Sequence, residues 1–260
     1  MIQKRIIDAF EDKDSKTKIW KSSFAAARLA YEEGRWKEAY RQLLKTLKRA
    51  EAIPEQALGE ACTNMGLGAV LTQMGRLKEA GERFEEALSV VGGDLNKAYK
   101  EVHAVTLMFF ADLKLEEGEP AEAEAMLLKS INLLESLGVD YALFLANSLC
   151  DLSGLYVGQE RYAEAEKYIN SAISILAKLK GRTDVTYTRA AMIHQICTHK
   201  DDEDYIFNLV KEDTTRMLYQ VSRKHPNLIR ALRRYAEHLE RHGETEKLDE
   251  LHRQFEEIFK

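Results

Sequence analysis

Four segments of the chain are near copies of one another, spaced about 42 residues apart. They read GRWKEAYRQLLKTL, GRLKEAGERFEEAL, GEPAEAEAMLLKSI and ERYAEAEKYINSAI, and they begin at Gly34, Gly75, Gly118 and Glu160, at intervals of 41, 43 and 42 residues. The same step predicts two further turns, one near 202 in KDDED (200–204) and one at Gly243. A period of this length indicates an array of stacked units, each packed mainly against its neighbours.

Each unit is predicted to contain two helices, which we call helix A and helix B, joined by a short turn. The chain has only 3 Pro and 14 Gly, a composition that favours helix. In the second unit, the apolar residues of helix B recur at the spacing of one helix face: Leu77, Ala80, Phe84, Ala87 and Leu88. Glycine at the turn is expected to end helix A because it adopts a positive φ at little cost.

This pattern resembles the tetratricopeptide repeat, whose usual period is about 34 residues. The residues that carry the resemblance in the second unit are Leu67, Gly68, Gly75, Ala80, Phe84 and Ala87. Units about eight residues longer, with about 12 Å of added helix, resemble those of kinesin light chains and their bacterial relatives. Residues 140–176 are most similar to that subtype, and residues 225–247 share its His-Pro start. The resemblance implies an all-α, right-handed superhelical solenoid of about six antiparallel helix pairs.

We expect a single solenoid over residues 15–260. Its units are predicted at about 15–54, 55–96, 97–138, 139–181, 182–224 and 225–260. Residues 1–14 place Ile2, Ile6 and Phe10 at helical spacing, which predicts an N-terminal capping helix or, alternatively, an arm that binds a partner or dimerises. The fifth unit lacks the Ala–aromatic–Ala pattern of helix B, so a bend or a specialised surface is expected there.

The sequence contains no recognisable catalytic or cofactor motif. Gly66 and Gly68 do not complete a dinucleotide-binding fingerprint, because its third glycine would fall at Leu71 and no strand precedes it. One cluster joins His194, Cys197 and His199, and His238 and His242 stand at i, i+4, but neither has a second half that would complete a metal site. We therefore expect no enzyme activity, no cofactor and no metal, with Cys197 buried and the histidines solvated.

Charge and hydropathy limit the classes of partner. A net charge of −5 gives no overall field that would attract nucleic acid. The longest apolar run, Leu107 to Ala111, is far shorter than the ~20 residues of a membrane-spanning helix. The three cysteines, Cys62, Cys150 and Cys197, are widely spaced and odd in number, which fits a reducing compartment and predicts a cytoplasmic protein.

The resemblance also implies a binding surface, because the A helices of such arrays line a concave groove. The groove positions of each helix A give the predicted site: Phe24, Arg28, Tyr31, Met65, Thr72, Gln73, Met108, Asp112, Leu115, Asn147, Arg230 and Arg233. The alternative is that several of these side chains point between the helices as core. The arginine-rich last unit would hold an acidic group, or Glu237 would pair within the helix with Arg233 and Arg241, each four residues away.

These observations predict a non-enzymatic scaffold or adaptor that binds a peptide or helical segment of a partner protein in the groove. The alternative is a regulatory sensor that binds a short peptide or a small effector. RNA binding is disfavoured because no base-reading pair of polar residues recurs from unit to unit. The sequence leaves homo-oligomerisation open.

Overall fold

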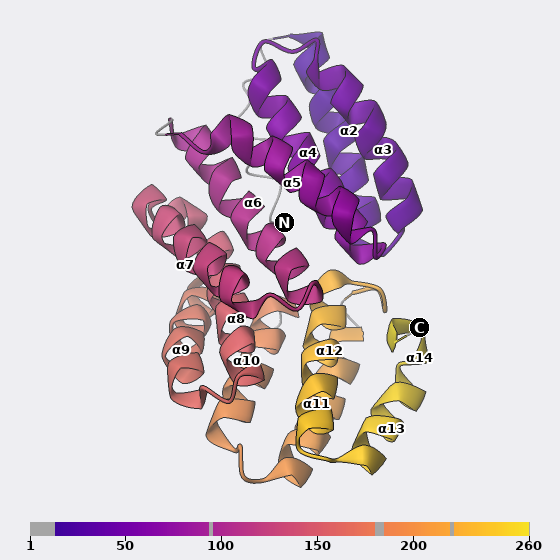
Figure 1. The fold of residues 1–260 in the computed structure, drawn as a ribbon, viewed down its shortest axis with the longest axis vertical. Coiled ribbons are helices and arrows are strands. Elements are labelled where there is room, and N and C mark those ends of the chain that lie inside the picture. Colours follow the sequence, from indigo (N-terminus) through magenta and orange to yellow (C-terminus); the bar gives the residue numbers. More distant parts are fainter. Residues whose placement is uncertain (1–13, 94–95, 180–184, 219–220, 260) are drawn as a thin grey trace. The chain divides into compact units, whose positions relative to one another are not determined.

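The structure, a computed structural model, describes residues 14–93, 96–179, 185–218 and 221–259, which form helices joined by short turns (Figure 1). No strand occurs in these ranges, so the predicted all-α repeat fold is confirmed. Within them, no helix is both long enough and apolar enough to cross a bilayer. The chain divides into two compact units, which are described separately: unit 1 ends at Ser148 and unit 2 begins at Leu149.

Unit 1 contains three helical hairpins. Its helices are α2 (Ser15–Glu32), α3 (Trp36–Ala50), α4 (Gln56–Gln73), α5 (Leu77–Val91), α6 (Lys97–Glu116) and α7 (Pro120–Leu137), followed by the short 3-10 helix η1 (Val139–Tyr141) and the first half of α8 (Ala142–Gly158). Each A helix, α2, α4 or α6, packs against the helix B that follows it, and α4 also packs against α2 and α6.

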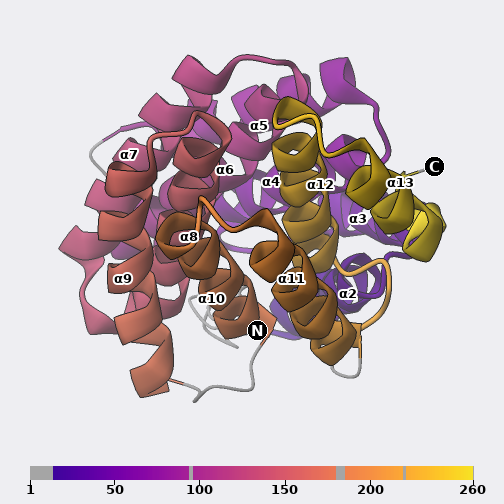
Figure 2. The same cartoon turned by 90° about the horizontal axis from the view of Figure 1, so that it is seen from below.

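Unit 2 continues from the second half of α8. Its further helices are α9 (Tyr162–Leu179), α10 (Val185–Thr198), α11 (Glu203–Leu218), α12 (Pro226–Arg241), α13 (Thr245–Gln254) and α14 (Glu256–Phe259). Helix α10 packs against α9, α11 and α12, and Figure 2 shows α9, α10 and α11 in succession. The fifth pair, α10–α11, is therefore a helical hairpin despite its unusual sequence. Its helix B buries Ile206, Phe207, Val210 and Met217.

The predicted turns are present at the expected positions. The residue that ends the A-helix turn has a positive φ in five units: 72° at Gly34, 71° at Gly75, 77° at Gly118, 59° at Glu160 and 71° at Gly243. The following N–H donates to a carbonyl five residues earlier, as in Arg76 N to Leu71 O at 3.0 Å, which is the bond of a Schellman turn. The turn of the fifth unit differs: Asp202 begins α11 by accepting a hydrogen bond from the N–H of Tyr205 at 3.0 Å.

Small residues allow the helices of unit 1 to pack closely. Ala80 and Ala87 of α5 are completely buried, and Gly68 of α4 lies directly against the ring of Phe84. The Phe84 ring stacks on Phe110 of α6 with centroids 5.1 Å apart, so one aromatic side chain joins three helices. The repeated small and aromatic positions are the core of this unit.

The predicted domain boundaries remain predictions. The capping helix was placed at residues 1–14, and all but the last of these lie outside the described residues. Asp14 is described: it is the N-cap of α2 and accepts a hydrogen bond from the N–H of Thr17 at 2.8 Å.

Candidate binding surface

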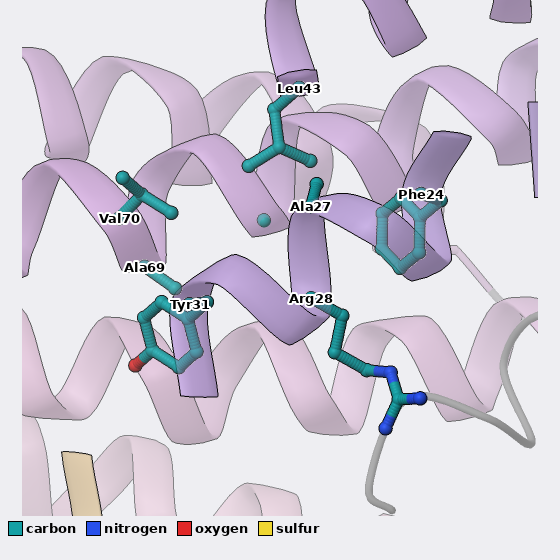
Figure 3. A pocket seen from close by; sticks show the side chains of 8 residues that line it. Phe24, Ala27, Arg28, Tyr31, Leu43, Ala69 and Val70 are labelled. Carbon is teal, nitrogen blue, oxygen red and sulfur yellow. The ribbon is translucent and has the colours of Figure 1, made fainter. Parts of the chain in front are cut away.

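A small crevice in unit 1 combines three of the predicted groove residues. It lies between α2, α3 and α4, and Figure 3 shows it from close by. Its lining residues are Phe24, Ala27, Arg28, Tyr31, Leu43, Gly66, Ala69 and Val70. Four of these come from α2, where their spacing of three and four residues places them on one face of the helix.

The floor of the crevice is apolar and tightly packed. Gly66 forms part of this floor, where α3 and α4 approach closely: a Cβ at this position would lie 3.1 Å from Cδ2 of Leu43, closer than most side chains allow. The cavity has a volume of about 10 Å³, roughly the room that one water molecule needs. A partner side chain would therefore contact the rim of the crevice rather than fill it.

Arg28 and Tyr31 form that rim. Figure 3 shows both side chains extending from α2 away from Leu43. Arg28 pairs with Glu32 at 3.2 Å, and the two side chains are 16% and 32% exposed. The Nε of Arg28 is buried and has no hydrogen-bond acceptor among the described residues. The ring of Tyr31 lies 5.3 Å from that of Trp36 and 6.4 Å from that of Phe109, which holds it in place.

The other predicted groove residues of unit 1 do not line the crevice. Met65 and Met108 are 0% and 1% exposed, as buried as Phe24, so the structure places them in the interior of the unit. Thr72 donates to the carbonyl of Gly68 at 3.0 Å, and the side-chain amide of Asn147 donates to the carbonyl of Leu143 at 2.8 Å, so both side chains are engaged within their own helices. Gln73, Asp112 and Leu115 are half-buried.

The two remaining predicted residues lie on α12 of unit 2. Arg230 is half-buried, with its Nη1 4.0 Å from Oδ1 of Asp151, and it donates to Oδ1 of Asn227 at 2.8 Å. Arg233 is also half-buried. Glu237, which was expected to pair with an arginine four residues away, pairs with Arg234 at 3.3 Å.

A buried ion pair beside Arg230 was missed by the sequence reasoning. Arg189 of α10 donates to Oδ1 of Asp151 of α8 at 2.6 Å, and both side chains are at most 5% exposed. One signal was available: Asp151 is the only charged residue in the run LFLANSLCDLSGLYV, residues 143–157. A lone carboxylate in an apolar helix needs a buried partner, because an unpaired buried charge is strongly destabilising.

The prediction that the histidines are solvated is wrong for His238. This side chain is completely buried, and its Nε2 lies 2.7 Å from Oε2 of Glu203, whose Oε1 accepts from the hydroxyl of Tyr235 at 2.8 Å. Burial alone would raise the pKa of Glu203, but the hydrogen bonds from His238 and Tyr235 lower it below its usual value. Burial, together with the nearby Glu203 carboxylate, raises the pKa of Tyr235. These two hydrogen bonds to Glu203 connect α11 to α12.

The cysteines are unsuited to nucleophilic chemistry. Burial raises the pKa of Cys150 to about 11 and that of Cys197 to about 12, and it raises the pKa of Cys62 well above its ordinary value. The thiolate is the reactive form, so these thiols are inert near neutral pH. Over the described ranges, no three His, Cys, Asp or Glu side chains come together as metal ligands would.

Comparisons with known proteins agree with the fold. A family model described as Tetratricopeptide repeat matches residues 22–94 and 102–178, more than half of the chain. A search of curated protein sequences found no match.

Three solved structures share the fold at low sequence identity. A Rap protein complexed with Competence and Sporulation Factor has a TM-score of 0.77 at 15% identity over 95% of this chain; the chain spans 65% of that protein's length. A putative kinesin light chain from Podosopora anserina, with nearly identical TPR-like repeats, has a TM-score of 0.56 at 14% identity, covering 80% of this chain and 98% of that one. BtubC (BKLC) from P. vanneervenii has a TM-score of 0.55 at 14% identity, covering 92% and 90%.

Proposed function

Because the chain belongs to the tetratricopeptide repeat family, we propose that it is a scaffold or adaptor that binds a peptide or helical segment of a partner protein against the A helices of unit 1. The fold is that of a protein-interaction module, and proteins of this repeat family are typically not enzymes. The partner is thus a protein, and no catalytic step is assigned to the chain.

The observation that carries the proposal is the crevice between α2, α3 and α4. Its rim presents an arginine and a tyrosine, the residue types that contribute most often to binding hot spots. Arg28 and Tyr31 are only partly buried, whereas Phe24, Met65 and Met108 are nearly inaccessible. A partner segment can therefore contact the rim without separating the helices, while the buried side chains support the wall from behind.

A photo-crosslinking experiment tests this placement. The photoreactive amino acid p-benzoylphenylalanine replaces Tyr31 in the full chain, and the matched control carries it at Glu79, an exposed position of α5. Both proteins are irradiated in extract of the source cells, and the crosslinked segments are identified by mass spectrometry. We expect one partner segment to crosslink at position 31 and not at position 79. Equal crosslinking at both positions would contradict a site at this rim.

A regulatory sensor is the second candidate function. It is favoured by one neighbour, the Rap protein, which was solved in complex with Competence and Sporulation Factor. A sensor would bind a short peptide or small effector directly, so a low-molecular-mass filtrate of the extract should raise the melting temperature of the chain. A scaffold should gain stability only from the fraction that contains proteins.

A further inference from the structure

The first helical hairpin carries a large net positive charge although the whole chain is net negative. Residues 15–50 hold ten Lys and Arg against three Glu, a net charge of +7, in a chain whose total is −5. The remaining residues therefore carry a net −12. The total charge alone conceals this asymmetry.

Within the hairpin, four of the ten cations form a row on the outer face of α3. Lys37, Arg41, Lys45 and Lys48 are all exposed and follow one another at i, i+4, i+8 and i+11. With 3.6 residues per turn they lie within about 80° around the helix axis and extend over about 16 Å along it. We call these four residues the basic row. The only other exposed residue of α3 is Arg49, so every exposed side chain of this helix is a cation.

The basic row has no ionic partner in the hairpin itself. None of its four side chains lies within 4 Å of a carboxylate oxygen in the part of the chain that the structure describes. Like charges at i, i+4 destabilise a helix slightly, so the row opposes the folding of α3 rather than supporting it.

The other repeats show that the fold does not require cations at these positions. Counted from the turn residue, the row occupies positions +3, +7, +11 and +14. The same positions are exposed in α5, α7 and α9. They hold Lys78, Glu82, Glu86 and Ser89 in α5; Ala121, Ala125, Lys129 and Asn132 in α7; and Ala163, Lys167, Ser171 and Ser174 in α9. These four B helices therefore share an outward-facing ridge, and only the ridge of α3 is fully cationic.

We propose that the basic row of α3 is a second docking surface, which binds an acidic segment of a partner protein. Successive cations along the row are about 6 Å apart, the spacing of carboxylates at i, i+4 on a helix. Charge complementarity favours such a segment and speeds its association.

The surroundings favour a short acidic protein segment over a nucleic acid. The exposed side chains of α3 include no aromatic ring on which a base could stack and no amide that could read a base edge, because Trp36, Tyr40 and Gln42 are half-buried. The corresponding ridge of the next helix B, α5, presents Glu82 and Glu86, which would repel a polyanion that extended beyond the row. This surface is separate from the crevice, so the proposal stands independently of the function proposed above.

The test compares two variants that lose the same charge. The first, Lys37→Ala/Arg41→Ala/Lys48→Asn, gives α3 the side chains that α7 carries at the same positions. The control, Lys78→Ala/Lys129→Ala/Lys167→Ala, removes three cations from the ridges of α5, α7 and α9. The probe is a fluorescein-labelled oligoglutamate of about twelve residues, whose binding is measured by fluorescence polarisation at about 0.15 M salt, and circular dichroism checks that each variant is folded.

The wild-type chain should bind the probe. The α3 variant should lose about tenfold or more in affinity for the probe, because it removes the basic row, whereas the affinity of the control should stay within about twofold of the wild type. Absence of binding by the wild type, or equal losses in the two variants, would overturn the proposal. A labelled DNA duplex bound at least tenfold more tightly than oligoglutamate, with the same dependence on the row, would overturn it in favour of nucleic acid.

Discussion

Replacement of Gly68 by alanine should destabilise unit 1, although alanine is the better helix former. A Cβ at this position would lie 2.6 Å from Cε1, 2.7 Å from Cδ1 and 2.8 Å from Cζ of Phe84. The ring has little freedom to move, because it is completely buried and stacked on Phe110. Alanine inside a helix gains about 1 kcal/mol over glycine, whereas overpacking costs about 1–3 kcal/mol. Three simultaneous close contacts place the cost near the upper end, so the expected net loss is about 1–2 kcal/mol.

The assay is urea unfolding followed by tryptophan fluorescence. Both tryptophans of the chain, Trp20 and Trp36, belong to unit 1, so the signal reports on the unit that is changed. Gly81→Ala is the matched control, because its Cβ would meet only Cδ2 of Leu113 at 3.8 Å, an ordinary contact. We expect Gly81→Ala to stabilise the unit by up to about 1 kcal/mol.

A second substitution tests the cause of the loss. In a chain that carries Phe84→Leu, the ring that clashes is gone, so the further change Gly68→Ala should cost much less than it does in the wild type. The reasoning is refuted if Gly68→Ala raises the urea midpoint as Gly81→Ala does, or if its cost is the same with and without the Phe84 ring.

Three further predictions concern packing, backbone strain and pH. Ala80→Leu should cost about 1–3 kcal/mol of stability by overpacking, whereas Glu79→Leu at the exposed neighbouring position should change stability by less than about 0.5 kcal/mol. If chemical denaturation ranks the two variants in the opposite order, the packed face of α5 has been assigned wrongly. Glu160→Gly should raise the melting temperature, because glutamate is strained at a φ of 59° and glycine is not; a lower melting temperature would show that the turn is unstrained. The pKa of Glu203 is lowered in the folded chain, so the contribution of this residue to stability is complete above its unfolded pKa near 4.5 and is lost as the pH falls through the lower folded pKa. Over that acidic range, the melting temperature of Glu203→Gln should therefore fall less than that of the wild type. Identical pH profiles of the two proteins would rule out the contribution.

The repeat positions could be predicted from the sequence because their causes are local. A turn that requires a positive φ favours glycine at one place in each unit, and a close helix contact favours Gly68 opposite an aromatic residue. The turn glycine recurs at a fixed interval, and Ala27 and Ala111 occupy the place of Gly68 in the neighbouring units, so the repeated small residues support one another. The turn at Glu160, where no glycine is present, was predictable because the segment that begins there is a near copy of the other three.

The features that the sequence reasoning missed depend on contacts between distant residues. Asp151 and Arg189 are separated by 38 residues, and Glu203 and His238 by 35. Nothing local predicts that such residues meet. The burial of Met65 and Met108 was likewise not predictable from repeat positions, because it depends on how closely neighbouring A helices pack. The basic row cannot be predicted from the total charge, because the net −12 of the remaining residues exceeds the +7 of residues 15–50.

We propose that a partner segment binds at the rim of the α2–α4 crevice, and two measurements on one variant test this binding site. These are the affinity of Tyr31→Ala for the crosslinked partner segment, measured by calorimetry, and the melting temperature of the same variant. A hot-spot side chain truncated to alanine costs more than about 1 kcal/mol of binding, roughly fivefold in affinity. We expect at least that loss with a melting temperature close to that of the wild type, because Tyr31 is only half-buried. Wild-type affinity in a folded Tyr31→Ala protein would contradict it.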